Sequence, residues 1–199
     1  MTKSTKDGGF VANNEKIKMQ INSNPVIAAV RSFDELSVAV LSPVKVIFLL
    51  NTSIAHVKEY VDFCHEHEKI VLVHFDLVPG LGTDDEAVRY LCSFSPDGII
   101  STKSGVLKTA YEQGVFTIQR FFIVDSRSCD TMRKSLNTFK PDMIEIMPGI
   151  LFDEIRKITA GGNIDVICGG MIEDKKTVIK LLSVGAMGIS TSRAKLWTI

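Results

Sequence analysis

The sequence predicts an α/β fold of the (β/α)8, TIM-barrel-like class, built as one compact domain with short loops. Eight short segments rich in Val and Ile begin 17–28 residues apart along the chain. Segments with one polar face lie between them, as expected for helices that cover a sheet. Strands that alternate with helices pair in parallel and are joined by right-handed crossovers. A chain of 199 residues is shorter than the usual barrel of about 250, so its loops must be short.

The predicted strands are nearly continuous apolar runs, which is typical of parallel strands buried on both faces. They occupy residues 26–30, 44–50, 70–75, 98–100, 115–122, 143–147, 164–168 and 186–190. The predicted helices occupy residues 33–41, 53–65, 84–94, 105–113, 128–139, 150–160 and 174–183. Because the fourth strand is so short, a doubly wound open sheet is the alternative fold.

Local signals agree with these boundaries. Asp84, Asp85 and Glu86 place carboxylates in a first helical turn, where the helix dipole favours them. Gly114 and Gly185 follow predicted helices, where glycine commonly ends a helix. Residues 1–16 are expected to form a disordered tail, and residues 17–199 the single barrel domain.

The composition limits the possible functions. Lys plus Arg and Asp plus Glu both number 23, so any nucleic-acid binding must come from a local basic patch. No apolar run approaches the roughly 20 residues of a membrane span, and the first residues lack the apolar core of a signal peptide. The four widely spaced cysteines form no metal-binding pattern, so we expect reduced thiols in a cytoplasmic protein and no metal site.

In a (β/α)8 barrel, functional side chains lie at the carboxyl ends of the strands. The residues predicted there as polar ligand contacts are Arg31, His74, Asp76, Lys103 and Glu145. Glu145 lies between two isoleucines, where a carboxylate is costly unless it is paired. The alternation of strand side chains places either Gln119 or Arg120 in the barrel mouth, and leaves both possibilities open.

The last two strands carry the strongest functional signal. Each ends in small residues that allow backbone N–H groups to approach an anion, and each is then expected to open a helix. The predicted phosphate-binding residues are Gly169, Gly170, Ser190, Thr191 and Ser192. Because barrels often bind phosphate with the loops after strands 7 and 8, the sequence predicts a small phosphorylated ligand.

Seven segments in the same order resemble the glycerol-uptake operon antiterminator (GlpP) family. They cover residues 25–31, 73–81, 96–103, 119–126, 141–149, 169–172 and 189–197, and the resemblance runs from about residue 17 to the end. It implies a regulator with no catalytic residue and no cofactor. Such a regulator responds to glycerol 3-phosphate and binds the leader mRNA of glycerol-metabolism genes. The chain departs from the family pattern at Asn51, where Glu is expected, and at Lys103, where Arg is commoner.

Two other functions remain open at this stage. The first is a small barrel enzyme acting on a triose or sugar phosphate, with Asp76 or Glu145 as general base and Lys103 as a Schiff-base or electrostatic residue. The second is a barrel that binds phosphate and regulates nothing.

Overall fold

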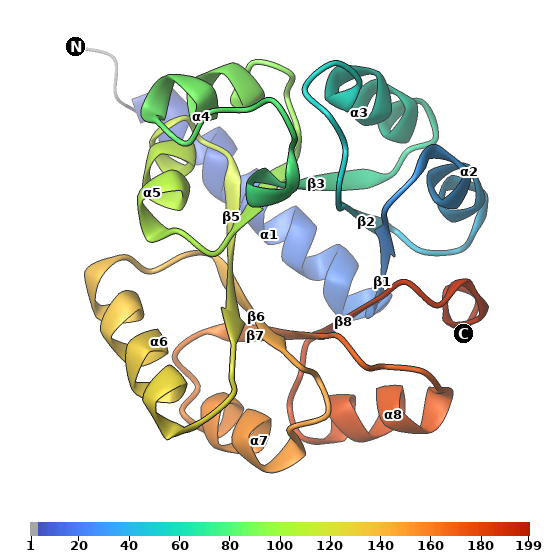
Figure 1. The fold of residues 1–199 in the computed structure, drawn as a ribbon, viewed down its shortest axis with the longest axis vertical. Coiled ribbons are helices and arrows are strands. Elements are labelled where there is room, and N and C mark those ends of the chain that lie inside the picture. Colours follow the sequence, from blue (N-terminus) through green and yellow to red (C-terminus); the bar gives the residue numbers. More distant parts are fainter. Residues whose placement is uncertain (1–3) are drawn as a thin grey trace.

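The computed structural model describes residues 4–199, with side chains from residue 12 onward, and contains a closed parallel barrel. Figure 1 looks along the barrel, with the strands in the middle and helices α2 to α8 around them. The strands are β1 (Val26–Val30), β2 (Val46–Leu49), β3 (Ile70–His74), β4 (Gly98–Ser101), β5 (Phe116–Phe122), β6 (Met143–Met147), β7 (Asp165–Gly169) and β8 (Gly188–Thr191). β1 pairs with β8 as well as with β2, so the predicted barrel is confirmed and the open sheet is wrong.

The predicted helices are all present, with ends that differ by a few residues. They are α2 (Phe33–Leu41), α3 (Val57–Glu66), α4 (Asp85–Cys92), α5 (Ser104–Glu112), α6 (Ser126–Thr138), α7 (Phe152–Ala160) and α8 (Lys175–Ser183). Short 3-10 helices follow β3 and β8, at η1 (Phe75–Leu77) and η2 (Ala194–Leu196). Asp85 and Glu86 lie in the first turn of α4, as the acidic run predicts, and Asp84 caps the helix by accepting a hydrogen bond from the Ala87 N–H. No helix within residues 4–199 is long and apolar enough to cross a membrane.

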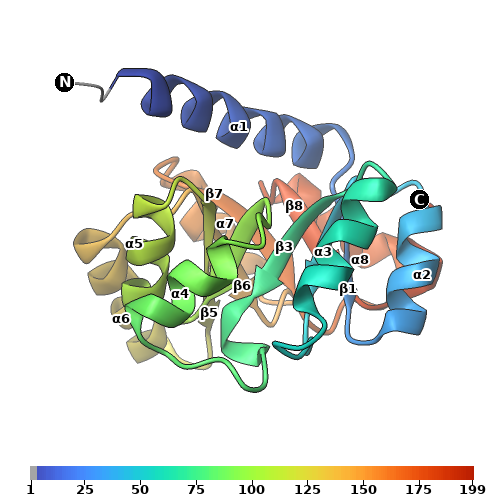
Figure 2. The ribbon, with the colours of Figure 1, turned by 90° about the horizontal axis from the view of Figure 1, so that it is seen from above.

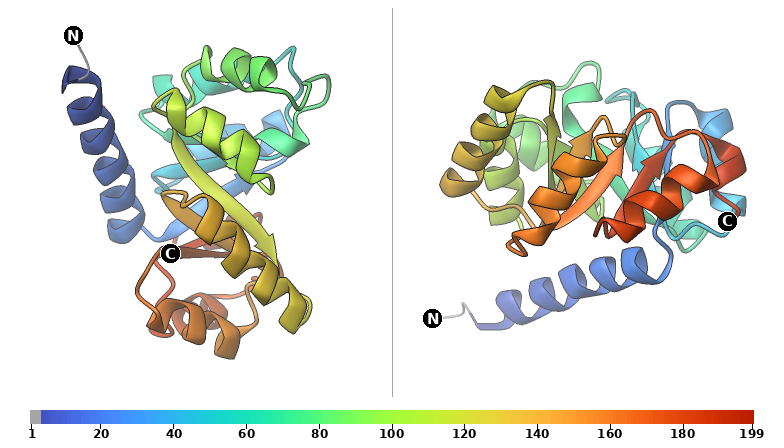
Figure 3. Two further views of the ribbon diagram at one scale, coloured as in Figure 1. Left: turned by 90° about the vertical axis from the view of Figure 1, so that its left-hand side faces the viewer. Right: turned by 90° about the horizontal axis from the view of Figure 1, so that it is seen from below.

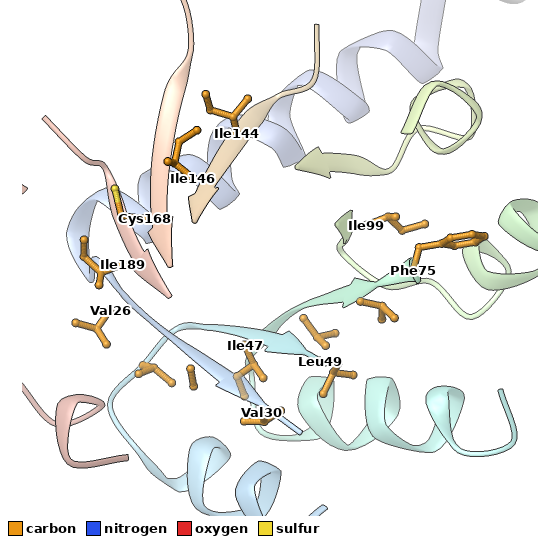
Figure 4. Packing of buried hydrophobic residues seen from close by; sticks show 14 of the residues in the cluster. Val26, Val30, Ile47, Leu49, Phe75, Ile99, Ile144, Ile146, Cys168 and Ile189 are labelled. Atoms are coloured by element: carbon orange, nitrogen blue, oxygen red, sulfur yellow. The ribbon is translucent and has the colours of Figure 1, made fainter. Parts of the chain in front are cut away.

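Side chains alternate between two apolar layers along each strand. In β1, for example, Val26, Ala28 and Val30 belong to the outer layer between strands and helices, which Figure 4 shows from close by. Ile27 and Ala29 belong to the inner layer, which fills the barrel. The strands therefore need apolar residues on both faces, and this is why they appear as continuous hydrophobic runs.

Helix α1 (Ser4–Ser23) lies across the amino-terminal end of the barrel, as Figures 2 and 3 show from several sides. Ile17 and Ile21 are buried in the inner apolar layer. Asn14 donates a hydrogen bond to Asp142 (2.8 Å), and Lys18 forms an ion pair with Asp165 (2.8 Å). The disordered tail expected over residues 1–16 therefore differs from the structure, in which residues 4–16 are helical and Asn14 is buried against the barrel.

Replacing Ile21 with alanine should test how firmly α1 closes the barrel. Ile21 is fully buried, and removing a buried isoleucine side chain usually costs about 2–5 kcal/mol of unfolding free energy. Met19→Ala is the matched control, because Met19 lies on the same helix with 69% of its surface exposed. Denaturant unfolding should show the loss for Ile21→Ala and almost none for Met19→Ala. Equal stabilities of the two variants would mean that α1 does not contribute to the core.

Candidate effector site

A cavity of about 340 Å³ opens at the carboxyl ends of the strands. Its wall combines three arginines and two glutamates with small and apolar residues. The lining residues are Ala29, Arg31, Leu50, Arg120, Glu145, Met147, Gly170, Met171, Ile172, Glu173, Ser190, Thr191, Ser192 and Arg193. Several of the strand ends predicted to form a site therefore surround one cavity. Most of its lining residues lie at the ends of β5, β6, β7, β8 and β1.

Glu145 is the centre of this wall and is completely buried. One carboxylate oxygen accepts a hydrogen bond from the Ser190 hydroxyl (2.5 Å), and the other accepts one from Arg120 Nε (2.6 Å). β5 and β6 are neighbours, with Arg120 opposite Glu145 in their register. The carboxylate that the sequence placed between two isoleucines is therefore paired, as its burial requires.

Arg120, and not Gln119, points into the barrel. Gln119 points outward and donates a hydrogen bond to the Ser135 hydroxyl on α6 (2.9 Å). The Arg120 side chain is buried and uses only Nε for its hydrogen bond to Glu145 in the described part of the chain. Its two terminal nitrogens are thus left on the cavity wall, held in place by a carboxylate and ready to bind an anion.

Glycine at position 169 makes room for this arrangement. A Cβ atom added there would lie against the Ser190 hydroxyl and 2.6 Å from a Glu145 carboxylate oxygen. Gly170 follows with a φ angle of +77°, which L side chains rarely adopt. Gly169 therefore leaves space for Glu145, and Gly170 allows the chain to turn along the cavity.

The hydroxyl groups of the β8 end are partly used within the protein. Thr191 donates to the Ile172 carbonyl (3.1 Å) and accepts from the Arg193 N–H (3.1 Å), and Trp197 Nε1 donates to the Thr191 carbonyl (2.9 Å). Thr191 therefore holds the loops after β7 and β8 together. Ser192 is exposed on the cavity wall.

The helix after β7 begins within one residue of its predicted start, whereas no full helix follows β8 within the described residues. Residues 170–174 separate β7 from α8, and the Asp174 side chain caps α8 by accepting from the Thr177 N–H (2.7 Å). β8 leads only into the three-residue helix η2. Helix N-termini therefore do not begin at the glycine and serine turns, and anion binding there would depend on Arg193 and the loop backbone.

The remaining predicted residues divide into two groups. Arg31 lines the cavity and forms an ion pair with Glu35 (2.9 Å). Asp76 instead accepts hydrogen bonds from the Ser101 hydroxyl and from the N–H and hydroxyl of Thr102, so it joins η1 to the end of β4. Lys103 is exposed next to α5 and is not among the residues lining the cavity. The ligand roles of Asp76 and Lys103 stay predictions.

His74 lies on the inward face of β3, two residues after Leu72 of the inner layer. It is buried, and neither ring nitrogen has a hydrogen-bond partner among the described residues. Burial, together with the positive charge of Arg120, lowers the pKa of His74 to about 4. The imidazole is therefore neutral at physiological pH, and because His74 is not among the residues lining the cavity, its ligand role stays a prediction.

This low pKa predicts an acid-sensitive fold. Below pH 6.5 the unfolded chain protonates this histidine, whereas the folded protein does so only near pH 4. Stability is therefore lost as the pH falls from 6.5 to 4, by up to about 3 kcal/mol. His74→Gln should flatten the dependence of the unfolding free energy on pH over this window. An unchanged pH dependence in His74→Gln would contradict the assigned pKa.

Sequence reasoning missed several residues of the wall. Arg193 and Glu173 form an ion pair (2.6 Å) across the loops after β8 and β7. The position of Arg193 in the same turn as Ser192 was the available signal. Leu50, Met147 and Met171 gave none, because apolar residues at strand ends resemble the core.

Comparison with known proteins decides the family. Residues 26–197 match the model of a family described as glycerol-3-phosphate responsive antiterminator. The chain belongs to this family. The match covers β1 to η2 and so includes every residue of the candidate effector site, and it confirms the resemblance found in the sequence.

Individual relatives support this membership. The glycerol uptake operon antiterminator regulatory protein of Listeria monocytogenes is 33% identical, with a TM-score of 0.85 over 87% of this chain and 95% of that one. An antiterminator-related protein of Thermotoga maritima is 29% identical, with a TM-score of 0.78 over 87% and 97%. An uncharacterized Escherichia coli protein, YgcP, is 32% identical over 90% of this chain and 94% of its own length.

Membership of the antiterminator family points to a regulatory protein rather than an enzyme. Aldolases share the fold at 16% and 11% identity, which is a likeness of fold alone. The cations on the described cavity wall are arginines, and guanidinium groups do not form the Schiff base that a lysine-dependent aldolase needs.

Proposed function

We propose that the protein is a transcription antiterminator that binds glycerol 3-phosphate in the barrel mouth and acts on the leader mRNA of glycerol-uptake genes in the cytoplasm. Glycerol 3-phosphate is its effector, and no further cofactor is required. The observation that carries the proposal is the cavity itself, where three arginines face one small space above a buried glutamate. Guanidinium groups are well suited to bind phosphate oxygens.

The phosphate group would bind between the loops after β7 and β8, near Gly170, Ser192 and Arg193. Arg193 is now paired with Glu173, and both side chains are more than half exposed. Exposed ion pairs contribute little to stability, so a phosphate dianion can replace Glu173 at low cost. The glycerol hydroxyls would then lie near Arg120 and Arg31, in the part of the cavity above Glu145.

A change in RNA affinity requires that the effector prefer one state of the protein. The loops after β7 and β8 are the natural place for such a preference, because the effector would join them through Arg193. The RNA-competent state would be the one in which these loops are ordered around the phosphate.

Thermal unfolding with a panel of ligands tests the effector. Glycerol 3-phosphate at 100 times its dissociation constant should add about 2.7 kcal/mol to the unfolding free energy and raise the melting temperature by several degrees. Glycerol, inorganic phosphate and dihydroxyacetone phosphate at the same concentration should give smaller shifts. If inorganic phosphate raises the melting temperature as much as glycerol 3-phosphate does, the cavity is a general anion site. If glycerol 3-phosphate causes no rise, the proposed effector is rejected.

A further inference from the structure

The neutral net charge of the chain conceals an uneven distribution. Residues 34–97, which include α2, α3 and α4, hold eleven Asp and Glu but only four Lys and Arg. Residues 98–199 hold fourteen Lys and Arg and ten Asp and Glu. Because consecutive elements are neighbours around a barrel, the acidic helices α2, α3 and α4 lie together, and the more basic half of the chain closes the ring back to α2, against which η2 packs.

The basic charge is concentrated at the end of the chain. Residues 175–199 contain five cations and not a single Asp or Glu. These five define what we term the cationic edge: Lys175, Lys176 and Lys180 on α8, with Arg193 and Lys195 at η2. α8 and η2 are neighbours on the outside of the barrel in Figures 1 and 3. The edge therefore forms one surface beside the candidate effector site. Arg193 belongs to both, because it also lines the cavity.

The lysines of α8 point away from the barrel. Val178 and Leu181 are the buried residues of this helix, whereas Lys175, Lys176, Ile179 and Lys180 are exposed. Arg193 is the only member of the edge in an ion pair among the described residues, and Lys180 lies over the Phe152 ring (3.8 Å). Lys175, Lys176 and Lys195 can thus contact a polyanion without first breaking an ion pair.

Helix stability explains Lys180, which lies in the last turn of α8 where the helix dipole favours a cation, but not the two lysines at the start of the helix. Lys175 and Lys176 occupy the first turn of α8, where the positive end of the helix dipole disfavours cations. Lys176 and Lys180 are four residues apart, and a like-charge pair at this spacing weakens a helix. Charges that cost the helix stability are better accounted for by a partner that binds them.

We propose that the cationic edge is the surface on which the RNA phosphate backbone docks. This inference rests on the proposed function and adds the location of the RNA. Two to five phosphates can be neutralised by such an edge, and each neutralised phosphate releases counterions, which makes the affinity depend on salt. The acidic side formed by α2, α3 and α4 would repel RNA and so fix the orientation of the complex.

Charge reversal on the edge tests the location. The test variant is Lys175→Glu/Lys176→Glu/Lys195→Glu, which spares Arg193 because it lines the cavity. The control variant is Lys108→Glu/Lys134→Glu/Lys140→Glu, which makes the same change in net charge at exposed lysines of α5, α6 and the loop after α6. Binding to the glycerol-uptake leader transcript is measured from 50 to 200 mM salt, with glycerol 3-phosphate present. The thermal shift caused by glycerol 3-phosphate is measured for each variant.

The test variant should bind the leader transcript at least about tenfold more weakly, with a salt slope smaller by about 2–3. The control should bind nearly as the parent, and both should keep the effector-induced thermal shift. Equal losses in the two variants, or a loss in the control alone, would overturn the docking surface while leaving RNA binding intact. The same binding assay is run with anionic phosphatidylglycerol vesicles in place of the transcript. If the parent protein binds the vesicles but not the transcript, or binds neither of them, both the RNA function and the docking surface are rejected.

Discussion

Glu145→Gln is expected to destabilise the protein by about 3–5 kcal/mol, because it leaves the buried guanidinium of Arg120 without a counter-charge. In a chain of this size that is a fall in melting temperature on the order of 10 °C. The glutamine carbonyl oxygen can still accept from Arg120 Nε, and its NH2 group can donate to the Ser190 hydroxyl oxygen, so the expected loss comes from the missing negative charge. Thermal and denaturant unfolding of the variant measure the effect directly.

The double variant Arg120→Met/Glu145→Leu separates folding from ligand binding. Replacing both members of a buried ion pair with apolar residues of similar size often restores stability, so this variant should unfold near the parent. Its thermal shift with glycerol 3-phosphate should nevertheless be lost, since Arg120 is absent from the cavity. A parent-like melting temperature for Glu145→Gln, or a full effector shift in the double variant, would contradict the role assigned to this pair.

Gly169→Ala is expected to weaken effector binding strongly while leaving the protein folded. The added methyl group would meet the Ser190 hydroxyl and a Glu145 oxygen, so the carboxylate and Arg120 must move. Overpacking of this kind usually costs about 1–3 kcal/mol. The same movement displaces the guanidinium from the cavity wall, so the effector-induced thermal shift should fall well below that of the parent.

Gly105→Ala is the matched control for this substitution. Gly105 lies in α5, and no atom comes within 4 Å of a Cβ added there. Alanine is favoured over glycine in a helix by about 0.5–1 kcal/mol, so this variant should be slightly more stable and bind the effector as the parent does. An effector response in Gly169→Ala equal to that of Gly105→Ala would show that the crowding around Glu145 does not matter.

The barrel could be predicted from sequence because its determinants are local. Continuous apolar strands, polar-faced helices and Asp84 at a helix start each act within a few residues. The role of α1 could not be predicted in this way. Its contacts join Asn14 to Asp142 and Lys18 to Asp165, and no local pattern marks residues so distant along the chain as neighbours.

Site residues could be predicted from the sequence where the chemical nature of a side chain conflicts with its apolar neighbours. A carboxylate between two isoleucines requires a partner, and this singled out Glu145. Which residue is that partner depends on the register of β5 and β6, so Arg120 and Gln119 could not be distinguished. For Asp76, the position at a strand end did not indicate that its oxygens accept hydrogen bonds from Ser101 and Thr102, and its ligand role stays a prediction.

The central claim is that effector binding in the barrel mouth controls RNA affinity. The most direct measurement is the dissociation constant of the glycerol-uptake leader transcript with and without glycerol 3-phosphate, at one fixed salt concentration. The account predicts tighter binding with the effector, by about 5–150-fold, and an equal increase in effector affinity when the RNA is saturating. An RNA affinity that is the same with and without glycerol 3-phosphate would contradict it.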